Sequence, residues 1–297
     1  PADAGAAYLS IDPGFWGVQE MALTASCLTV VGTGGCGFEQ QLTAAVVAAE
    51  RESNTDFMRP HSLLLVLVIS DEEDCSIENG PAFFASQELQ SLYRINTACG
   101  IHSEALYTPA EIKQMAINAK AEVSGPQMAD SAVLFAAIVG VPRTPVCQGS
   151  GTDIAGCLDV ALEFGTVGEP GKVQRLPPGT TSGPEASYFE FACERYDGDT
   201  PITQASSGTR FVQVAQEFGD SGYVSSICND DWTPAMMDIA AMIKDRLAGH
   251  CFPETLAWDS ATQTSACDLV MEFYGNDCPA GYDWSDVVSV GTEETPQ

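Results

Sequence analysis

An uninterrupted run of large aliphatic side chains, followed directly by acidic residues, constrains the fold of this chain more than any other feature. Residues 63–69 read Leu-Leu-Leu-Val-Leu-Val-Ile, and residues 70–76 read Ser-Asp-Glu-Glu-Asp-Cys-Ser. The aliphatic run is too short to span a bilayer and too continuous for a strand with one wet face. It predicts a strand in the buried centre of a parallel sheet. Because ligands of open α/β sheets bind beyond the carboxyl ends of the strands, the acidic residues predict a Mg²⁺ or Ca²⁺ site there.

Composition limits the classes of partner. The 297 residues are 45% hydrophobic, which is enough for one large domain or two small ones. Asp and Glu number 41 against 12 Lys and Arg, which gives a formal net charge of -29. This charge repels nucleic acid and anionic lipid, so we expect no nucleic-acid partner and no binding to a membrane surface. We interpret most of the charge as a solvated acidic surface suited to a saline or extracellular medium, with a minority of carboxylates binding ions.

The cysteines favour disulfides over zinc. The chain has 11 cysteines and only 3 histidines, and no Cys-x-x-Cys pair occurs. Disulfides indicate an oxidising compartment, such as the cell surface, the periplasm or the medium. Order along the chain suggests Cys27/Cys36, Cys75/Cys99, Cys147/Cys157 and Cys193/Cys228, although sequence does not fix the connectivity. The other candidates are Cys251, Cys267 and Cys278, and the odd total leaves one thiol free or bonded outside the chain.

Export is implied by the cysteine usage, yet the sequence begins at Pro1 without a signal segment. We therefore expect a processed or truncated product that is extracellular or at the cell surface, with outer-membrane association as one form. No apolar run approaches membrane-spanning length, so we expect no direct membrane span.

Hydrophobic periodicity predicts an α/β fold with a doubly wound, mostly parallel sheet. Residues 132–141 predict a second parallel strand, and residues 222–227 predict a short edge strand. The other predicted helices are residues 17–26, 38–52, 108–123 and 209–218, with a partly helical stretch at 83–93. In a last helix over residues 235–247 one face carries Met236, Ile239, Ala240, Ile243 and Leu247. We predict a first domain over residues 1–250, with an insertion at 142–187, and a small disulfide-rich appendix over 251–297.

Residues 32–40, 68–76 and 225–231, taken together, resemble the von Willebrand factor A domains of secreted or lipid-anchored bacterial surface proteins. Residues 32–40 read Gly-Thr-Gly-Gly-Cys-Gly-Phe-Glu-Gln before a helix, and residues 68–76 read Val-Ile-Ser-Asp-Glu-Glu-Asp-Cys-Ser after a strand. Residues 225–231 read Ser-Ser-Ile-Cys-Asn-Asp-Asp before the last helix. The likeness covers residues 20–255 and implies a six-stranded, Rossmann-like, doubly wound sheet.

The resemblance also implies a metal-ion-dependent adhesion site at the top of that sheet. The family holds the metal with an Asp-x-Ser-x-Ser loop, a Thr from a second loop and an Asp after the fourth strand. Asp71 matches that Asp and Thr33 matches the Thr, with Glu72, Glu73 or Asp74 assisting. The cation would be Mg²⁺ or Ca²⁺, and a carboxylate from a protein ligand would complete its shell.

The chain departs from the family pattern because it contains no Asp-x-Ser-x-Ser sequence. Nothing before Val30 is typical of a buried central strand either. In the family the first strand lies beside the strand that ends at Asp71, and its absence leaves a hydrophobic edge unpaired. We infer that a protein partner, or a retained amino-terminal fragment, supplies the missing strand. The alternative is that residues 8–31 rebuild a smaller sheet without a metal site.

Catalytic motifs are missing from the sequence. The chain has no Gly-x-Ser-x-Gly elbow, no base next to Ser70 or Ser76 and no phosphate-binding Lys in its glycine-rich loop. We expect an extracellular adhesion or assembly module that binds a protein partner through the cation, and not an enzyme. One alternative is a structural subunit of a cell-surface filament or complex with a degenerate metal site. Another is a metal-dependent hydrolase, which would need a second ligand cluster. We favour Asp230 and Asp231 as caps of the last helix, and the alternative is a second cation site formed with Asn229. We expect His61, His102 and His250 to be surface or packing residues.

Overall fold

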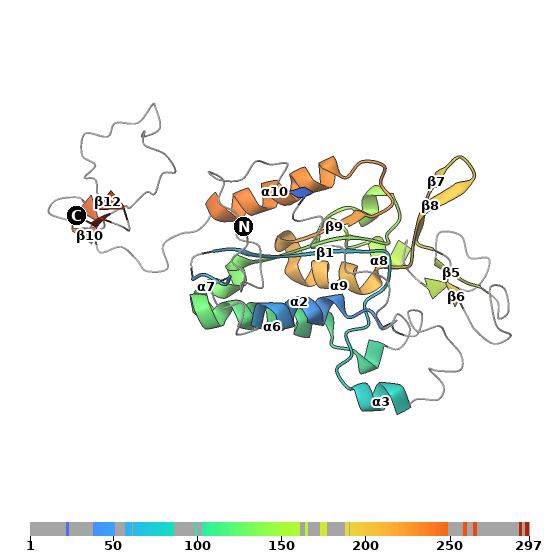
Figure 1. The fold of residues 1–297 in the computed structure, drawn as a ribbon, viewed down its shortest axis with the longest axis horizontal. Coiled ribbons are helices and arrows are strands. Elements are labelled where there is room, and N and C mark those ends of the chain that lie inside the picture. Colours follow the sequence, from blue (N-terminus) through green and yellow to red (C-terminus); the bar gives the residue numbers. More distant parts are fainter. Residues whose placement is uncertain are drawn as a thin grey trace. The chain divides into compact units, whose positions relative to one another are not determined.

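A four-stranded, mostly parallel sheet organises the computed structural model (Figure 1). In order across the sheet, the strands are β1 (Leu64–Ser70), β2 (Val133–Val139), β9 (Gly222–Ser226) and β3 (Gly149–Ser150). The first three are parallel, with Leu64 beside Val133 and Phe135 beside Gly222, and β3 is antiparallel to β9. The predicted α/β class with a mostly parallel sheet is confirmed.

The structure describes residues 22–23, 38–50, 57–60, 62–85, 99, 103–160, 164–165, 173–176, 188–189, 191–248, 258–259, 264–265, 291–292 and 295–296. The chain divides into two units, Pro1–Ser10 with Val30–Pro253 and Ile11–Thr29 with Glu254–Gln297. The four-stranded sheet belongs to the first. The second contains the antiparallel pairs β10 (Trp258–Asp259) with β11 (Thr264–Ser265) and β12 (Gly291–Thr292) with β13 (Thr295–Pro296). The predicted division at residue 250 stays a prediction, and Cys251, Cys267 and Cys278 lie outside the described residues.

Burial differs among the three parallel strands. All residues of β2 and β9 are buried, and each of these strands has a neighbouring strand on both sides. The prediction of an edge strand at residues 222–227 is therefore wrong. Within the described residues β1 pairs with β2 alone, and its Leu67 and Ile69 side chains are 38% and 50% exposed. The strand expected at the buried centre of the sheet thus lies at an edge of the described sheet.

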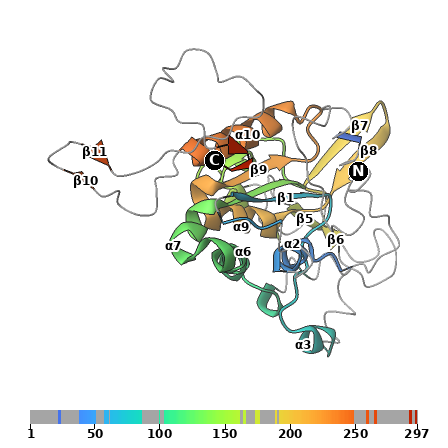
Figure 2. The same ribbon diagram turned by 60° about the vertical axis from the view of Figure 1, so that its left-hand side comes forward.

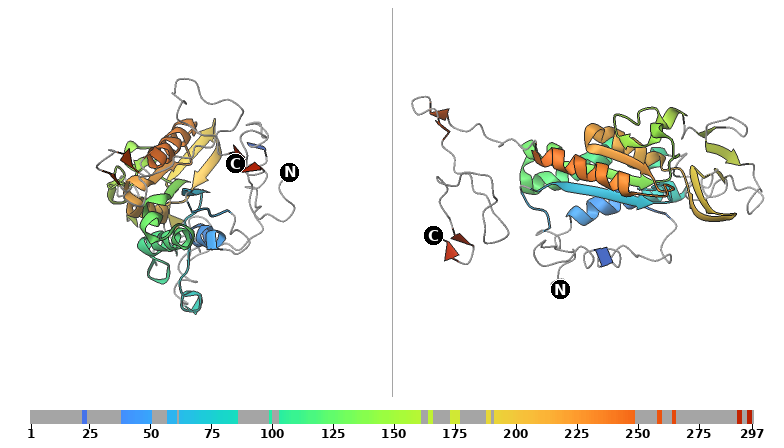
Figure 3. Two further views of the ribbon diagram at one scale, coloured as in Figure 1. Left: turned by 90° about the vertical axis from the view of Figure 1, so that its left-hand side faces the viewer. Right: turned by 90° about the horizontal axis from the view of Figure 1, so that it is seen from above.

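Helices cover both faces of the sheet (Figures 1 and 3). On one face lie α2 (Gln41–Glu50), α6 (Pro109–Ser124) and α9 (Thr209–Phe218), and on the other lies α10 (Thr233–Ala248). Leu42 of α2, Ile112 of α6 and Phe211 of α9 share a core with Phe135 of β2. These helices confirm the predictions at residues 38–52, 108–123 and 209–218. Of the predicted helix at 17–26, only residues 22–23 are described, and both are helical.

The buried face of α10 is shifted from the predicted one. Ile239 is buried as expected, but its buried neighbour one turn earlier is Ala235. Met236 and Leu247 are 45% and 57% exposed, so their predicted burial is wrong. The reason is that α10 contacts the sheet over a small area, around Ala136 and Tyr223. The apolar side chains to either side of this contact stay uncovered.

A hairpin lies at the carboxyl end of the sheet (Figures 1 and 2). It consists of β7 (Cys193–Asp197) and β8 (Thr200–Ala205), paired antiparallel. Just after β8, the backbone N–H of Ser206 donates to the carbonyl oxygen of Asp71 at 2.8 Å. The remaining short elements include α3 (Gly80–Ala85), α7 (Pro126–Ala129), α8 (Cys157–Val160), β4 (Phe164–Gly165), β5 (Val173–Leu176) and β6 (Tyr188–Phe189).

Disulfides connect the loops of the sheet. The bridges Cys75–Cys99, Cys147–Cys157 and Cys193–Cys228 confirm three of the predicted pairs. Cys27 and Cys36 lie outside the described residues. These bridges are consistent with an extracellular protein. No helix in the described part of the chain has the length and apolar character that a bilayer crossing needs.

Candidate functional site

The acidic residues after β1 differ in burial along the loop. Asp71 is exposed and Glu72 is partly buried. Glu73 and Asp74 turn inward and are only 3% and 0% exposed. Because the chain carries few basic residues, the burial of two adjacent carboxylates requires other hydrogen-bond donors.

Glu73 binds the start of α9. Its carboxylate accepts from the backbone N–H of Thr209 at 2.9 Å and of Arg210 at 3.1 Å. The N-cap residue of α9 is Gly208, which has no side chain to do this, so Glu73 supplies the cap from another loop. It also accepts from the N–H of Asp74 at 3.1 Å. Burial raises the pKa of Glu73 to about 8, and the N–H groups of Arg210 and Asp74 oppose that rise.

Asp74 joins two helices and a buried arginine. One carboxylate oxygen accepts from the N–H of Leu42 in α2 at 3.1 Å and from Ser76 Oγ at 2.7 Å. The other accepts from the N–H of Ser76 and from Arg210 Nε, both at 3.0 Å. Arg210 in turn donates to the carbonyl oxygen of Tyr107 at 2.6 Å. The four acceptor positions of this carboxylate are thus occupied by protein donors.

The cation ligands predicted from sequence are only partly brought together. The carboxylates of Glu73 and Asp74 accept hydrogen bonds from α9 and α2. Thr33 lies outside the described residues. Among the described residues, no group of three or more His, Cys, Asp or Glu side chains is placed to hold a metal ion. Of the four acidic residues after β1, Asp71 is the exposed one. The metal site at Asp71 and Thr33 stays a prediction.

Two unsatisfied polar atoms flank the end of β1. In the described part of the chain, Gln41 Oε1 and Arg195 Nε are the buried side-chain atoms without a hydrogen-bond partner. Gln41 donates through Nε2 to Ser70 Oγ at 2.9 Å, which places its free oxygen beside the last residue of β1. Arg195 lines a pocket of about 530 Å³ together with Asp71. Sequence reasoning missed both residues, because neither belongs to a motif.

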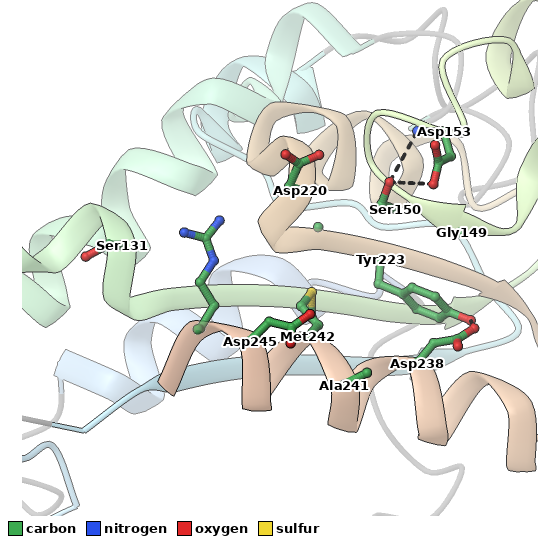
Figure 4. A pocket seen from close by; sticks show the side chains of 12 residues that line it. Ser131, Gly149, Ser150, Asp153, Asp220, Tyr223, Asp238, Ala241, Met242 and Asp245 are labelled. Carbon is green, nitrogen blue, oxygen red and sulfur yellow. Dashed lines mark hydrogen bonds between the residues drawn. The ribbon is translucent and has the colours of Figure 1, made fainter. Parts of the chain in front are cut away.

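A second pocket, of about 650 Å³, lies between α10 and the β9–β3 edge (Figure 4). Four aspartates line it, and three of them, Asp153, Asp220 and Asp238, accept from nearby hydroxyl groups. Asp153 accepts from Ser150 at 2.8 Å, and Asp238 accepts from Tyr223 at 3.0 Å. Burial and this hydrogen bond raise the pKa of Tyr223. These hydrogen bonds account for the positions of Asp153, Asp220 and Asp238 without a bound ligand.

The predicted helix cap is confirmed for one of the two aspartates. Asp231 accepts from the N–H of Thr233, the first residue of α10, at 2.8 Å. Hydrogen bonds from Thr233 lower the pKa of Asp231. Asp230 instead forms an exposed ion pair with Arg143 at 2.6 Å. The three histidines lie outside the described residues.

No family model, no curated protein and no solved structure matches this chain. The function is therefore argued from the fold and the residues at the carboxyl end of the sheet.

Proposed function

We propose that this chain is an extracellular adhesion or assembly module of von Willebrand factor A type that binds a protein partner at the carboxyl end of its parallel sheet. One observation carries the proposal: within the described sheet β1 has a neighbour on one side only, and exposed Asp71 follows its last residue, near the unsatisfied Gln41 and Arg195 atoms. Ligands of open α/β sheets bind at this end.

The edge of β1 that no described strand covers fits a strand from another polypeptide. Leu65, Leu67 and Ile69 point to the face covered by α10, whereas Leu64 and Val68 pack into the core on the other face. Leu67 and Ile69 stay 38% and 50% exposed. A long apolar edge strand is a template for strand addition. We propose that the partner adds a parallel strand at β1 and covers these side chains with an apolar segment.

The cation part of the proposal assigns different roles to the acidic residues. Asp71 and Thr33 would bind Mg²⁺ or Ca²⁺, with Glu72 assisting, and a carboxylate of the partner would complete the shell. Glu73 and Asp74 would instead hold the loop in place through their contacts with α9, α2 and Arg210. Export to an oxidising compartment is supported by the three disulfides.

Site-specific photo-cross-linking tests the strand addition. Benzoylphenylalanine replaces Leu67 at the β1 edge or, as a control, Val47, which is 49% exposed on α2. In the cells that produce the protein, we expect Leu67 to cross-link one defined peptide that contains an aliphatic run. The substitution Ile69→Lys should abolish that product. Capture of the same proteins from both positions would contradict the proposal.

Chelation separates the cation-dependent module from the structural subunit. With the cross-linked partner as ligand, EDTA and Asp71→Asn should each weaken binding, whereas Asp230→Asn on the same edge should not. Binding that is unchanged by EDTA and by Asp71→Asn would favour a structural subunit with a degenerate metal site.

A further inference from the structure

The β7–β8 hairpin is held over the carboxyl end of the sheet at two points. Cys193, the first residue of β7, is bridged to Cys228, just after β9. At the other end, the N–H of Ser206 donates to the carbonyl oxygen of Asp71 at 2.8 Å. Gly140 allows this approach, because a Cβ there would lie 1.7 Å from the carbonyl oxygen of Ser206. The hairpin is thus fixed relative to β1, β2 and β9.

Arg195 lies on the inner face of this hairpin. Cys193 and Arg195 are two positions apart in β7, so their side chains point to the same side of the strand. Thr203 is the cross-strand partner of Arg195, and the register of the ladder shifts immediately after this pair. Such a shift redirects a side chain. Arg195 and Thr203 both line the 530 Å³ pocket that Asp71 also borders, here named the hairpin pocket.

The guanidinium of Arg195 has no partner within the described residues. Its Nε atom is buried without a hydrogen bond. By contrast, Arg143 pairs with Asp230 and Arg210 pairs with Asp74. The chain has 41 acidic residues against 12 Lys and Arg, so a shortage of carboxylates does not explain the unpaired guanidinium. Arg195 is partly exposed, but its Nε–H is a buried donor without an acceptor, which is unfavourable, and an anionic acceptor that enters the pocket would relieve that cost.

Apolar side chains form part of the other walls of the hairpin pocket, which also include the polar residues Thr203 and Gln204. The apolar residues are Pro201, Ile202, Ile227 and Trp232. The indole N–H of Trp232 is already donated to the carbonyl oxygen of Ile227 at 3.3 Å, and Ile202 is 51% exposed. The pocket therefore offers one cationic donor group beside an apolar wall. This combination suits a carboxylate carried next to an apolar or aromatic side chain.

We propose that the hairpin pocket binds such a carboxylate from a peptide segment of the partner, with Arg195 as the donor. This inference rests on the proposed function for the existence of a protein partner and names the chemistry that the partner presents. It does not depend on a metal. Asp71 borders the same pocket, so a cation bound to Asp71 would reduce the repulsion of the incoming carboxylate and strengthen its binding.

Small peptide probes test the inference without the natural partner. The acidic probes are acetyl-glutamyl-phenylalanine amide, which carries a side-chain carboxylate, and free acetyl-glutaminyl-phenylalanine, which carries a terminal one. Acetyl-glutaminyl-phenylalanine amide is the neutral control. Binding is followed in EDTA by the ¹H–¹⁵N resonance of the Arg195 Nε–H group. We expect a saturable shift with one or both acidic probes, which identifies the carboxylate source, and none with the neutral probe.

Matched variants complete the test. Arg195→Gln should lower the affinity for the acidic probe by about tenfold or more, and Arg195→Lys should lower it less. Ligand-observed NMR measures both affinities. Arg143→Gln removes the same charge from the same sheet edge and should bind as the parent does. Equal binding of acidic and neutral probes, or equal losses in Arg195→Gln and Arg143→Gln, would overturn the inference. Addition of Mg²⁺ tests only the proposed function: no tightening would reject the cation at Asp71 and leave the Arg195 pocket intact.

Discussion

Glu73 and Asp74 show that residues of one acidic motif have different tasks. The sequence predicts oxygen ligands for a cation after β1, and the structure uses two of these carboxylates to bind helix starts and Arg210. No local pattern could have indicated this, because Thr209 and Arg210 are far from Glu73 in sequence. Asp71, the residue that the resemblance places in the metal site, is the one that the loop leaves exposed.

The buried Glu73 carboxyl gives a pH dependence. Burial raises its pKa from 4.5 to about 8 in the folded chain, so the folded state binds more protons than the unfolded state between these values. The free energy of unfolding should therefore fall as pH rises through this window, by at most about 1.4 kcal/mol per pH unit. A glutamine at this position does not titrate, so Glu73→Gln should flatten the pH dependence of the free energy of unfolding, measured with urea. Glu78→Gln, at an exposed position, should leave that pH dependence unchanged. Parallel curves for the parent and Glu73→Gln would contradict this assignment.

The Asp74–Arg210 pair should be important for stability. Its side chains are 0% and 3% exposed, so Asp74→Asn leaves a buried guanidinium without its counter-charge. We expect a loss of about 3–5 kcal/mol in the free energy of unfolding. Asp230→Asn breaks the exposed pair with Arg143 and should cost no more than about 1 kcal/mol. Chemical denaturation of both variants measures the difference, and equal losses would show that Asp74 has no special structural role.

At the scale of elements, sequence patterns succeeded where the signal is local. The aliphatic runs predicted β1 and β2, and α6 begins with a capping box between Thr108 and Glu111. The start of α9 is capped by Glu73 from another loop, so its cap had no local signal. β9 was mistaken for an edge strand because its outer neighbour, β3, is only two residues long. Short strands of this kind leave no periodic pattern.

The Cys193–Cys228 bridge should stabilise the hairpin and the pocket beneath it. Its sequence separation is 35, against 10 for Cys147–Cys157. Loop-closure entropy gives losses of about 4 and about 3 kcal/mol when these bridges are replaced by alanine pairs. Urea unfolding measures both losses. We expect only Cys193→Ala with Cys228→Ala to lower the affinity of the acidic probes, and unchanged affinity in that variant would show that the bridge does not position Arg195.

At the scale of the whole molecule, a net charge of -29 and an apolar strand edge coexist. We expect this charge to repel nucleic acid. Within the described residues, β1 is the long strand that lacks a neighbour on one side, because β2 and β9 each pair with two strands. The resemblance predicts an unpaired edge, because the chain lacks the Asp-x-Ser-x-Ser motif of the family, and a strand supplied by another polypeptide stays a prediction. No local sequence pattern indicates the hairpin pocket beside that edge.

Hydrogen–deuterium exchange of the chain, alone and bound to its cross-linked partner, tests the central claim most directly. We expect the amides of residues 64–76 to gain strong protection in the complex, together with the β7–β8 hairpin, while the exposed surface of α2 is unchanged. Unchanged exchange in residues 64–76, with new protection elsewhere, would contradict binding at the carboxyl end of the sheet.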